Sequence, residues 1–99
     1  MNRGKRVVTR TAKELAKALG LSPAEGTEIE LRSDLNAKIV TEIKRRGLTH
    51  AEVAQLARTS RTRVTAIVNR NTKDISTDLL LRVLQALGWT ARVRFERAA

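Results

Sequence analysis

The segment that decides the fold is residues 48–70, LTHAEVAQLARTSRTRVTAIVNR. Thr49 is followed three residues later by Glu52, which is the spacing of a capping box and predicts a helix over residues 50–57. A helix of this length is not stable by itself in water. We therefore expect contacts with neighbouring helices to hold it.

A turn and a second short helix follow directly. The polar triplet at residues 58–60 ends the first helix, and Ser60 is placed to cap a helix over residues 61–69. Two short helices joined by a three-residue turn are the pattern of a helix-turn-helix, in which the second helix enters the major groove of DNA. The sequence thus predicts a helix-turn-helix unit over residues 49–69.

Start and stop signals elsewhere predict further helices, for a mostly α fold of about five helices in all. The longest begins at Pro23 or, because Gly26 weakens that start, nearer Glu28. The additional ranges are 12–19, 23–47 and 77–87, and the last of these carries a wide apolar face. We expect residues 1–10 to be a flexible basic tail and residues 11–99 to form a single helix-turn-helix domain.

The C-terminal segment changes to a period of two. Over residues 90–97, apolar side chains alternate with polar ones, which predicts a half-buried β-strand. A lone strand needs a partner, either residues 5–9 or the same strand of a second copy, paired antiparallel about a twofold axis. A frayed or irregularly packed tail is the alternative. The residues expected at a dimer contact are Leu84, Trp89, Ala91, Val93 and Phe95.

The charge of the chain is concentrated in one region. There are 20 Lys+Arg against 10 Asp+Glu, for a formal net charge of +10. Residues 44–73 hold eight of the basic residues and a single acidic one, Glu52. This local excess indicates a polyanionic partner, and a solvated basic face or a membrane surface are the alternatives.

Several classes of function are disfavoured. No apolar run is long enough to cross a bilayer and residues 1–20 lack a signal-peptide core, so we expect a cytoplasmic protein without a membrane partner. Because there is no Cys and only one His, His50, we expect neither a metal site nor a cofactor. An enzyme is disfavoured because Glu28 and Glu30 point to different helix faces and no nucleophile triad or phosphate-binding loop is present.

Residues 48–70 closely resemble the helix-turn-helix of the Xre/Cro-repressor-like superfamily. Residues 75–95, ISTDLLLRVLQALGWTARVRF, resemble the continuation found in the HigA-type antitoxin branch, and the likeness covers about residues 28–97. The resemblance implies a lambda-repressor-like bundle that binds DNA. Where Arg58 stands, the family usually has Gly with a positive φ, so either the turn tolerates Arg with some strain or its backbone differs.

The two short helices divide into a packing face and a reading face. Ala54 is small because the helices cross closest there, and apolar contacts are expected from Val53, Leu56, Val64, Ile67 and Val68. With Val64 at the centre of the buried face, a spacing of 100° per residue turns a polar stripe of the second helix outward. The candidate DNA-binding residues are His50, Ser60, Arg61, Thr62, Arg63, Thr65, Ala66, Asn69, Arg70 and Lys73.

Roles within this set follow from side-chain chemistry and from the resemblance. Arginine can bond both acceptors of guanine, so Arg61 or Arg63 is expected to read a G, while Ser60, Arg70 and Lys73 contact phosphate. The resemblance implies that His50, at the start of its helix, touches phosphate and supports the reader. The alternatives are that His50 only starts a helix and that Thr62 and Thr65 are exposed without contacting DNA.

These inferences favour a homodimeric, sequence-specific repressor that binds an inverted-repeat operator in duplex DNA. The resemblance implies that it is the antitoxin of a type II toxin-antitoxin pair, which neutralises a RelE-like ribonuclease toxin and represses its own operon. The acidic stretch Glu25–Asp34 and the helix over residues 12–19 are the expected toxin surface. A free-standing Xre-type or phage-type repressor is the alternative, and RNA binding is least favoured because both aromatic residues lie outside the basic block.

Overall fold

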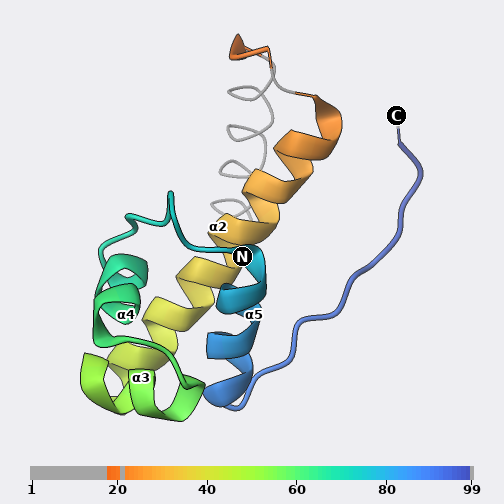
Figure 1. The fold of residues 1–99 in the computed structure, drawn as a ribbon. Helices are drawn as coiled ribbons and strands as arrows, with labels where there is room; N and C mark the ends of the chain where they lie inside the picture. The colour runs from red at the N-terminus through yellow and green to blue at the C-terminus, as the bar shows by residue number, and fades with distance from the viewer. Residues whose placement is uncertain (1–17, 21, 99) are drawn as a thin grey trace. The chain divides into compact units, whose positions relative to one another are not determined.

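The computed structural model describes residues 18–20 and 22–98 (Figure 1). The predicted basic tail over residues 1–10, and most of the helix expected over residues 12–19, lie outside the described residues. The chain divides into two compact units between Asp34 and Leu35. The described helices are α2, Pro23–Arg46; α3, His50–Ala57; α4, Arg61–Val68; and α5, Thr77–Ala86. A mostly helical fold is therefore confirmed.

Helix α2 begins at Pro23, the first of the two starts considered from the sequence, and ends at Arg46. The Ser22 hydroxyl accepts a hydrogen bond from the Glu25 N–H at 3.1 Å, and the Glu25 carboxylate accepts one from the Ser22 N–H at 3.1 Å. Beyond its last residue, Gly47 has φ +63°, the left-handed conformation that ends many helices. In the N-terminal unit, the α2 residues Ile29 and Leu31 remain 39% and 37% exposed.

The core of the C-terminal unit lies where α2, α3, α4 and α5 pack together. Val53 and Ala54 on α3 and Val64 and Ile67 on α4 are buried, as predicted. The remaining core residues are Leu35, Ile39, Ile43, Ala57, Ile75, Leu79, Leu80, Val83, Leu84 and Leu87. This core holds the two short helices that could not be stable alone.

The expectation that Leu56 supplies a core contact is wrong, because its side chain is 52% exposed. Val53, Ala54 and Ala57 occupy the inward positions of α3. At 100° per residue, Leu56 lies roughly 110° around the helix from the centre of that face. Its side chain therefore points out of the core.

Two polar side chains of α2 are bonded to the backbone of other helices. Asn36, which is buried, donates from Nδ2 to the carbonyl of Ile67 at the end of α4, at 2.9 Å. Arg46 donates from Nη1 to the carbonyl of Leu87, just after α5, at 2.8 Å. Both donate to carbonyls at helix ends, where the helix itself supplies no N–H four residues later. The Ile67 carbonyl also accepts a hydrogen bond from the Arg70 N–H at 3.1 Å. Asn36 and Arg46 thus connect α2 with the ends of α4 and α5.

Trp89 packs against α2 of its own chain. The Lys38 ammonium lies 3.5 Å from the centroid of the Trp89 ring, a cation–π contact. The nearby Glu42 carboxylate is buried and pairs with Arg45 at 2.8 Å. Hydrogen bonds from the side chains of Arg45 and Trp89 lower the pKa of Glu42 to about 2. The start of the C-terminal tail is thereby held on α2.

The strand predicted over residues 90–97 is not formed. Among the described residues none is in a strand, and residues 88–98 are all exposed. Figure 1 shows this tail leaving the end of α5 as an extended segment away from the helices. The physical reason is that an extended segment pairs its backbone groups only with another strand, and no described segment of this chain lies beside it. Residues 5–9, the other suggested partner, lie outside the described residues.

Candidate nucleic-acid interface

The two short helices begin on the predicted caps. Thr49 and Glu52 form a reciprocal capping box, with the Thr49 N–H donating to Glu52 Oε1 at 2.8 Å and the Glu52 N–H donating to Thr49 Oγ1 at 3.1 Å. The bond from the Thr49 backbone lowers the pKa of the Glu52 carboxyl. Ser60 accepts from the Arg63 N–H at 3.1 Å and so caps α4. Both cap predictions are confirmed.

The turn between α3 and α4 has the backbone of a glycine turn, although Arg58 occupies it. Arg58 has φ 55° and ψ 51°, in the left-handed region. The N–H of Thr59 donates to the Ala54 carbonyl at 2.9 Å, which closes the end of α3. The sequence left two possibilities, an Arg in a strained left-handed conformation or a turn with a different backbone. The structure has the first of these.

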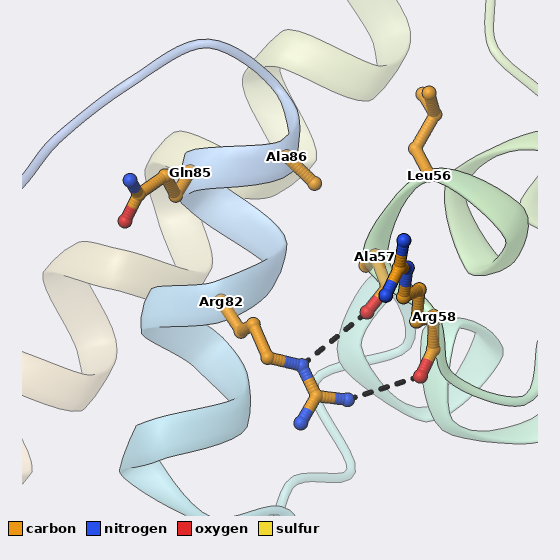
Figure 2. A pocket seen from close by; sticks show the side chains of 6 residues that line it. All are labelled: Leu56, Ala57, Arg58, Arg82, Gln85 and Ala86. Carbon is orange, nitrogen blue, oxygen red and sulfur yellow. Dashed lines mark hydrogen bonds between the residues drawn. The ribbon is translucent and has the colours of Figure 1, made fainter.

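A residue from α5 contacts this turn. Arg82 donates from Nε to the Ala57 carbonyl at 3.3 Å and from Nη2 to the Arg58 carbonyl at 3.1 Å, as the dashed lines in Figure 2 show. The same residues border an open groove between the end of α3 and α5, lined by Leu56, Ala57, Arg58, Arg82, Gln85 and Ala86. The contact could not be predicted from local sequence, because Arg82 lies 25 and 24 residues after the two residues that it bonds.

The candidate DNA-binding residues lie on the outer side of α4 and in the segments that flank it. Val64 and Ile67, which face inward, are both fully buried. His50, Thr65 and Ala66 are half-buried. The exposed candidates are Ser60, Arg61, Thr62, Arg63, Asn69, Arg70 and Lys73. The polar stripe of α4 is thus available to a partner.

His50 and Thr65 are brought together from different helices. His50 Nδ1 lies 2.8 Å from Thr65 Oγ1, at hydrogen-bond distance. The contact joins the first residue of α3 to the middle of α4. It also leaves the second ring nitrogen, Nε2, as the group of His50 that can bond another partner.

The basic residues of the 44–73 block have different environments. Arg45 is paired with Glu42, and Arg46 is bonded to the Leu87 carbonyl at the end of α5. Lysine and arginine at the end of α2 also interact favourably with the negative end of the helix dipole. Arg61, Arg63, Arg70 and Lys73 instead lie exposed on α4 and the loop after it. The positive charge offered to a polyanion is therefore concentrated around α4.

The residues expected at a dimer contact fall into two groups. Leu84 is only 4% exposed and lies in the core, because it shares the inward face of α5 with Leu80 and Val83. Its side chain is already covered within its own chain. Val93 and Phe95 in the tail are 75% and 92% exposed. Ala91 is also exposed, while Trp89 combines 42% exposure with its contacts to α2.

Membrane-spanning and metal-binding features are both missing from residues 18–20 and 22–98. No helix there is long and apolar enough to cross a membrane. No group of three or more His, Asp or Glu side chains in the same part of the chain is arranged to hold a metal ion.

Comparison with known proteins places the chain in a family. No curated protein and no solved structure matches it. A family model described as a helix-turn-helix domain matches residues 11–96 of the 99. A helix-turn-helix domain indicates a DNA-binding regulator. Together with the capped α3–turn–α4 unit and its exposed basic face, this match shows that the chain belongs to the helix-turn-helix domain family.

Proposed function

We propose that this protein is a sequence-specific transcriptional repressor that acts by binding duplex DNA rather than by catalysis. The observation that carries the proposal is the exposed, basic outer face of α4, set on a core that buries the opposite face. Helices of this kind lie in the major groove with the residues near their start against the base edges. Arg61 and Arg63 occupy that end of α4.

The individual roles follow from the chemistry of each side chain. Arg61 or Arg63 reads a guanine by donating hydrogen bonds to both acceptors of that base. Thr62 lies between the two arginines in the sequence and is also exposed. Arg70 and Lys73 contact phosphates, which supplies affinity without sequence preference. His50, with Nδ1 bonded to Thr65, directs its remaining ring nitrogen to a phosphate.

Selection from a library of randomised DNA duplexes tests the assignment of readers. The wild-type protein should enrich one sequence motif, and Arg61→Ala/Arg63→Ala should relax that preference by about 1 to 3 kcal/mol for each base that is no longer read. The matched control is Arg70→Ala/Lys73→Ala, which removes the same charge and should weaken binding to all sequences alike. Absence of any enriched motif for the wild-type protein would exclude sequence-specific binding.

We also propose that the repressor is a homodimer whose two α4 helices lie about one duplex turn, roughly 34 Å, apart on an inverted repeat. The support is the exposed tail. Val93 and Phe95 are 75% and 92% exposed, so the described residues leave most of their apolar surface uncovered, and a second tail would both cover it and pair the backbone. The enriched motif should then contain two half-sites of opposite orientation.

An antitoxin role is a second candidate. In the N-terminal unit, Glu25, Glu28 and Asp34 are exposed on the same helix as Ile29 and Leu31. Such an acidic and partly apolar surface suits a basic ribonuclease toxin of the RelE-like class. Co-expression with the product of the adjacent reading frame should yield a complex and restore growth. Failure of both would favour a free-standing repressor.

A further inference from the structure

Arg82 lies on α5, outside the helix-turn-helix unit, yet its guanidinium is bonded to the turn of that unit. Its Nε and Nη2 atoms donate to the carbonyls of two consecutive residues, Ala57 at 3.3 Å and Arg58 at 3.1 Å (Figure 2). The planar guanidinium can bond two neighbouring acceptors at once, which a lysine ammonium cannot do with the same geometry. These two bonds span 25 and 24 residues of sequence.

The turn needs such support for two reasons. The last carbonyls of a helix have no partner within the helix, and they form its negative end, so a cationic donor stabilises them. Arg58 is also held at φ 55°, a conformation in which its Cβ is crowded. Glycine would adopt this conformation freely, whereas arginine adopts it against its own preference.

The conformation of this turn determines where α4 begins. Ser60, the cap of α4, comes two residues after Arg58, and Arg61 opens the helix. A change of φ and ψ at residue 58 would rotate everything that follows it. Because α4 is short, the turn and its packing contacts set its direction together.

We propose that Arg82 is a positioning residue for DNA reading: by bonding the Ala57 and Arg58 carbonyls, it holds the α3–α4 turn in its left-handed form and so sets the orientation of α4. This inference rests on the proposed function, because it assigns to Arg82 an effect on base recognition. A residue that only stabilised the fold would change the amount of folded protein, and the ratio between specific and non-specific binding would stay the same.

The test measures that ratio. The affinity of each variant is determined for the duplex that the wild-type protein selects from a randomised library, and for a duplex of the same length and composition with scrambled sequence. In Arg82→Met, the preference for the selected duplex should fall about tenfold, the equivalent of the cost of an unsupported left-handed residue. Arg82→Lys keeps the charge but not the paired bonds. Its preference for the selected duplex should lie between that of Arg82→Met and that of the wild-type protein.

Two further variants separate positioning from charge and from folding. Lys44→Met removes one exposed positive charge at the end of α2 and should leave the preference unchanged. Arg58→Gly/Arg82→Met should recover most of the preference, because glycine holds the left-handed turn without the two bonds. If Arg82→Met fails to fold, this double variant should still fold and discriminate, and amide hydrogen exchange should show α4 protected in it.

The outcomes distinguish the two proposals. A wild-type protein without sequence preference would overturn the proposed function and the role of Arg82 with it. A wild-type preference that Arg82→Met retains would overturn the role of Arg82 alone. That role would also be overturned if Arg58→Gly/Arg82→Met were as impaired as Arg82→Met, because the impairment would then not come from the turn.

Discussion

Arg58 adopts a backbone conformation that most side chains avoid, at the position where the chain must reverse between two short helices. From the resemblance, this is a position where glycine with a positive φ is usual, so the sequence left open a left-handed Arg or a different backbone. Arg58 has φ 55°, which is the left-handed alternative. Only the structure shows that the left-handed turn is retained. It also shows that Arg82 donates hydrogen bonds to the two carbonyls at this turn, those of Ala57 and Arg58.

Replacement of Arg58 by glycine should stabilise the protein. The side chain is exposed and its left-handed backbone costs about 1–2 kcal/mol, of which part returns as the greater freedom of glycine in the unfolded chain. We expect Arg58→Gly to raise the free energy of unfolding by about 1 kcal/mol, measured by urea denaturation. Arg63→Gly, inside α4 with ordinary helical backbone, should lower it by a similar amount, and equal effects of both variants would contradict the argument.

Glu42 makes the free energy of unfolding depend on pH in the acidic range. Its pKa is lowered from 4.5 to about 2, chiefly by the hydrogen bond from Arg45. A carboxyl whose pKa is lower in the folded state stabilises the fold above its unfolded pKa, and that contribution is lost as pH falls from about 4.5 toward 2. The free energy of unfolding should therefore decline over this range.

Denaturation of Glu42→Gln at a series of pH values tests this coupling. The variant should be less stable than wild type at neutral pH and should show a shallower decline between pH 4.5 and 2. Glu96→Gln removes a carboxylate from the exposed tail without removing these contacts, and serves as the control. An unchanged decline in Glu42→Gln would show that another group is responsible.

At the scale of elements, the helix starts follow closely from local sequence. Thr49, Ser60 and Ser76 each accept a hydrogen bond from an N–H three residues later, because a cap acts within one turn. The inward faces were less predictable. Leu56 fits an apolar pattern but points outward, because the direction of a short helix is set by what it packs on.

The Thr49 cap should contribute measurably to stability. Thr49→Ala removes the acceptor for the Glu52 N–H and should lower the free energy of unfolding by about 1 kcal/mol. Thr41→Ala, at an exposed position inside α2, is the matched control and should be neutral or slightly stabilising. Equal destabilisation by both variants would mean that the capping box adds nothing.

Asn36 joins α2 to α4 through a bond that the sequence does not reveal. Asn36→Ala removes one of the two donors to the Ile67 carbonyl and leaves the bond from the Arg70 N–H, so we expect the free energy of unfolding to fall by about 0.5–1.5 kcal/mol. Asn71→Ala, exposed in the loop after α4, should have little effect. Amide exchange would localise the change, and unaltered protection at the end of α4 would contradict the assignment.

At the scale of the whole molecule, the C-terminal tail is the segment whose apolar side chains and backbone are left exposed by the described residues. Phe95→Asp should weaken a homodimer by at least about tenfold, since burial of a phenylalanine contributes roughly 1.5–3 kcal/mol. Thr90→Asp makes the same charge change on the other face of the predicted strand and should leave the dimer intact. Sedimentation over a range of protein concentrations measures dimer dissociation for the two variants and for the wild type. A wild-type protein that stays monomeric would contradict the proposed dimer.

The candidate site was predictable to the extent that it depends on periodicity. Because α4 repeats every 3.6 residues, burial of Val64 and Ile67 places Thr62 on the opposite side of the helix and Arg61 and Arg63 on its two flanks. The contacts that orient this face were not predictable. His50 and Thr65 are 15 residues apart, and Arg82 is more than 20 residues from the turn it supports.

The sequence by itself determined the helices, their caps, the helix-turn-helix spacing and the location of the positive charge. These properties arise within one or two turns of chain, where each residue acts on near neighbours. Tertiary structure alone decided that Arg58 keeps a left-handed turn, that Asn36 and Arg82 serve the ends of other helices, and that the tail has no strand partner among the described residues. The reason is physical: such contacts depend on the folded path of the chain, which brings distant residues together.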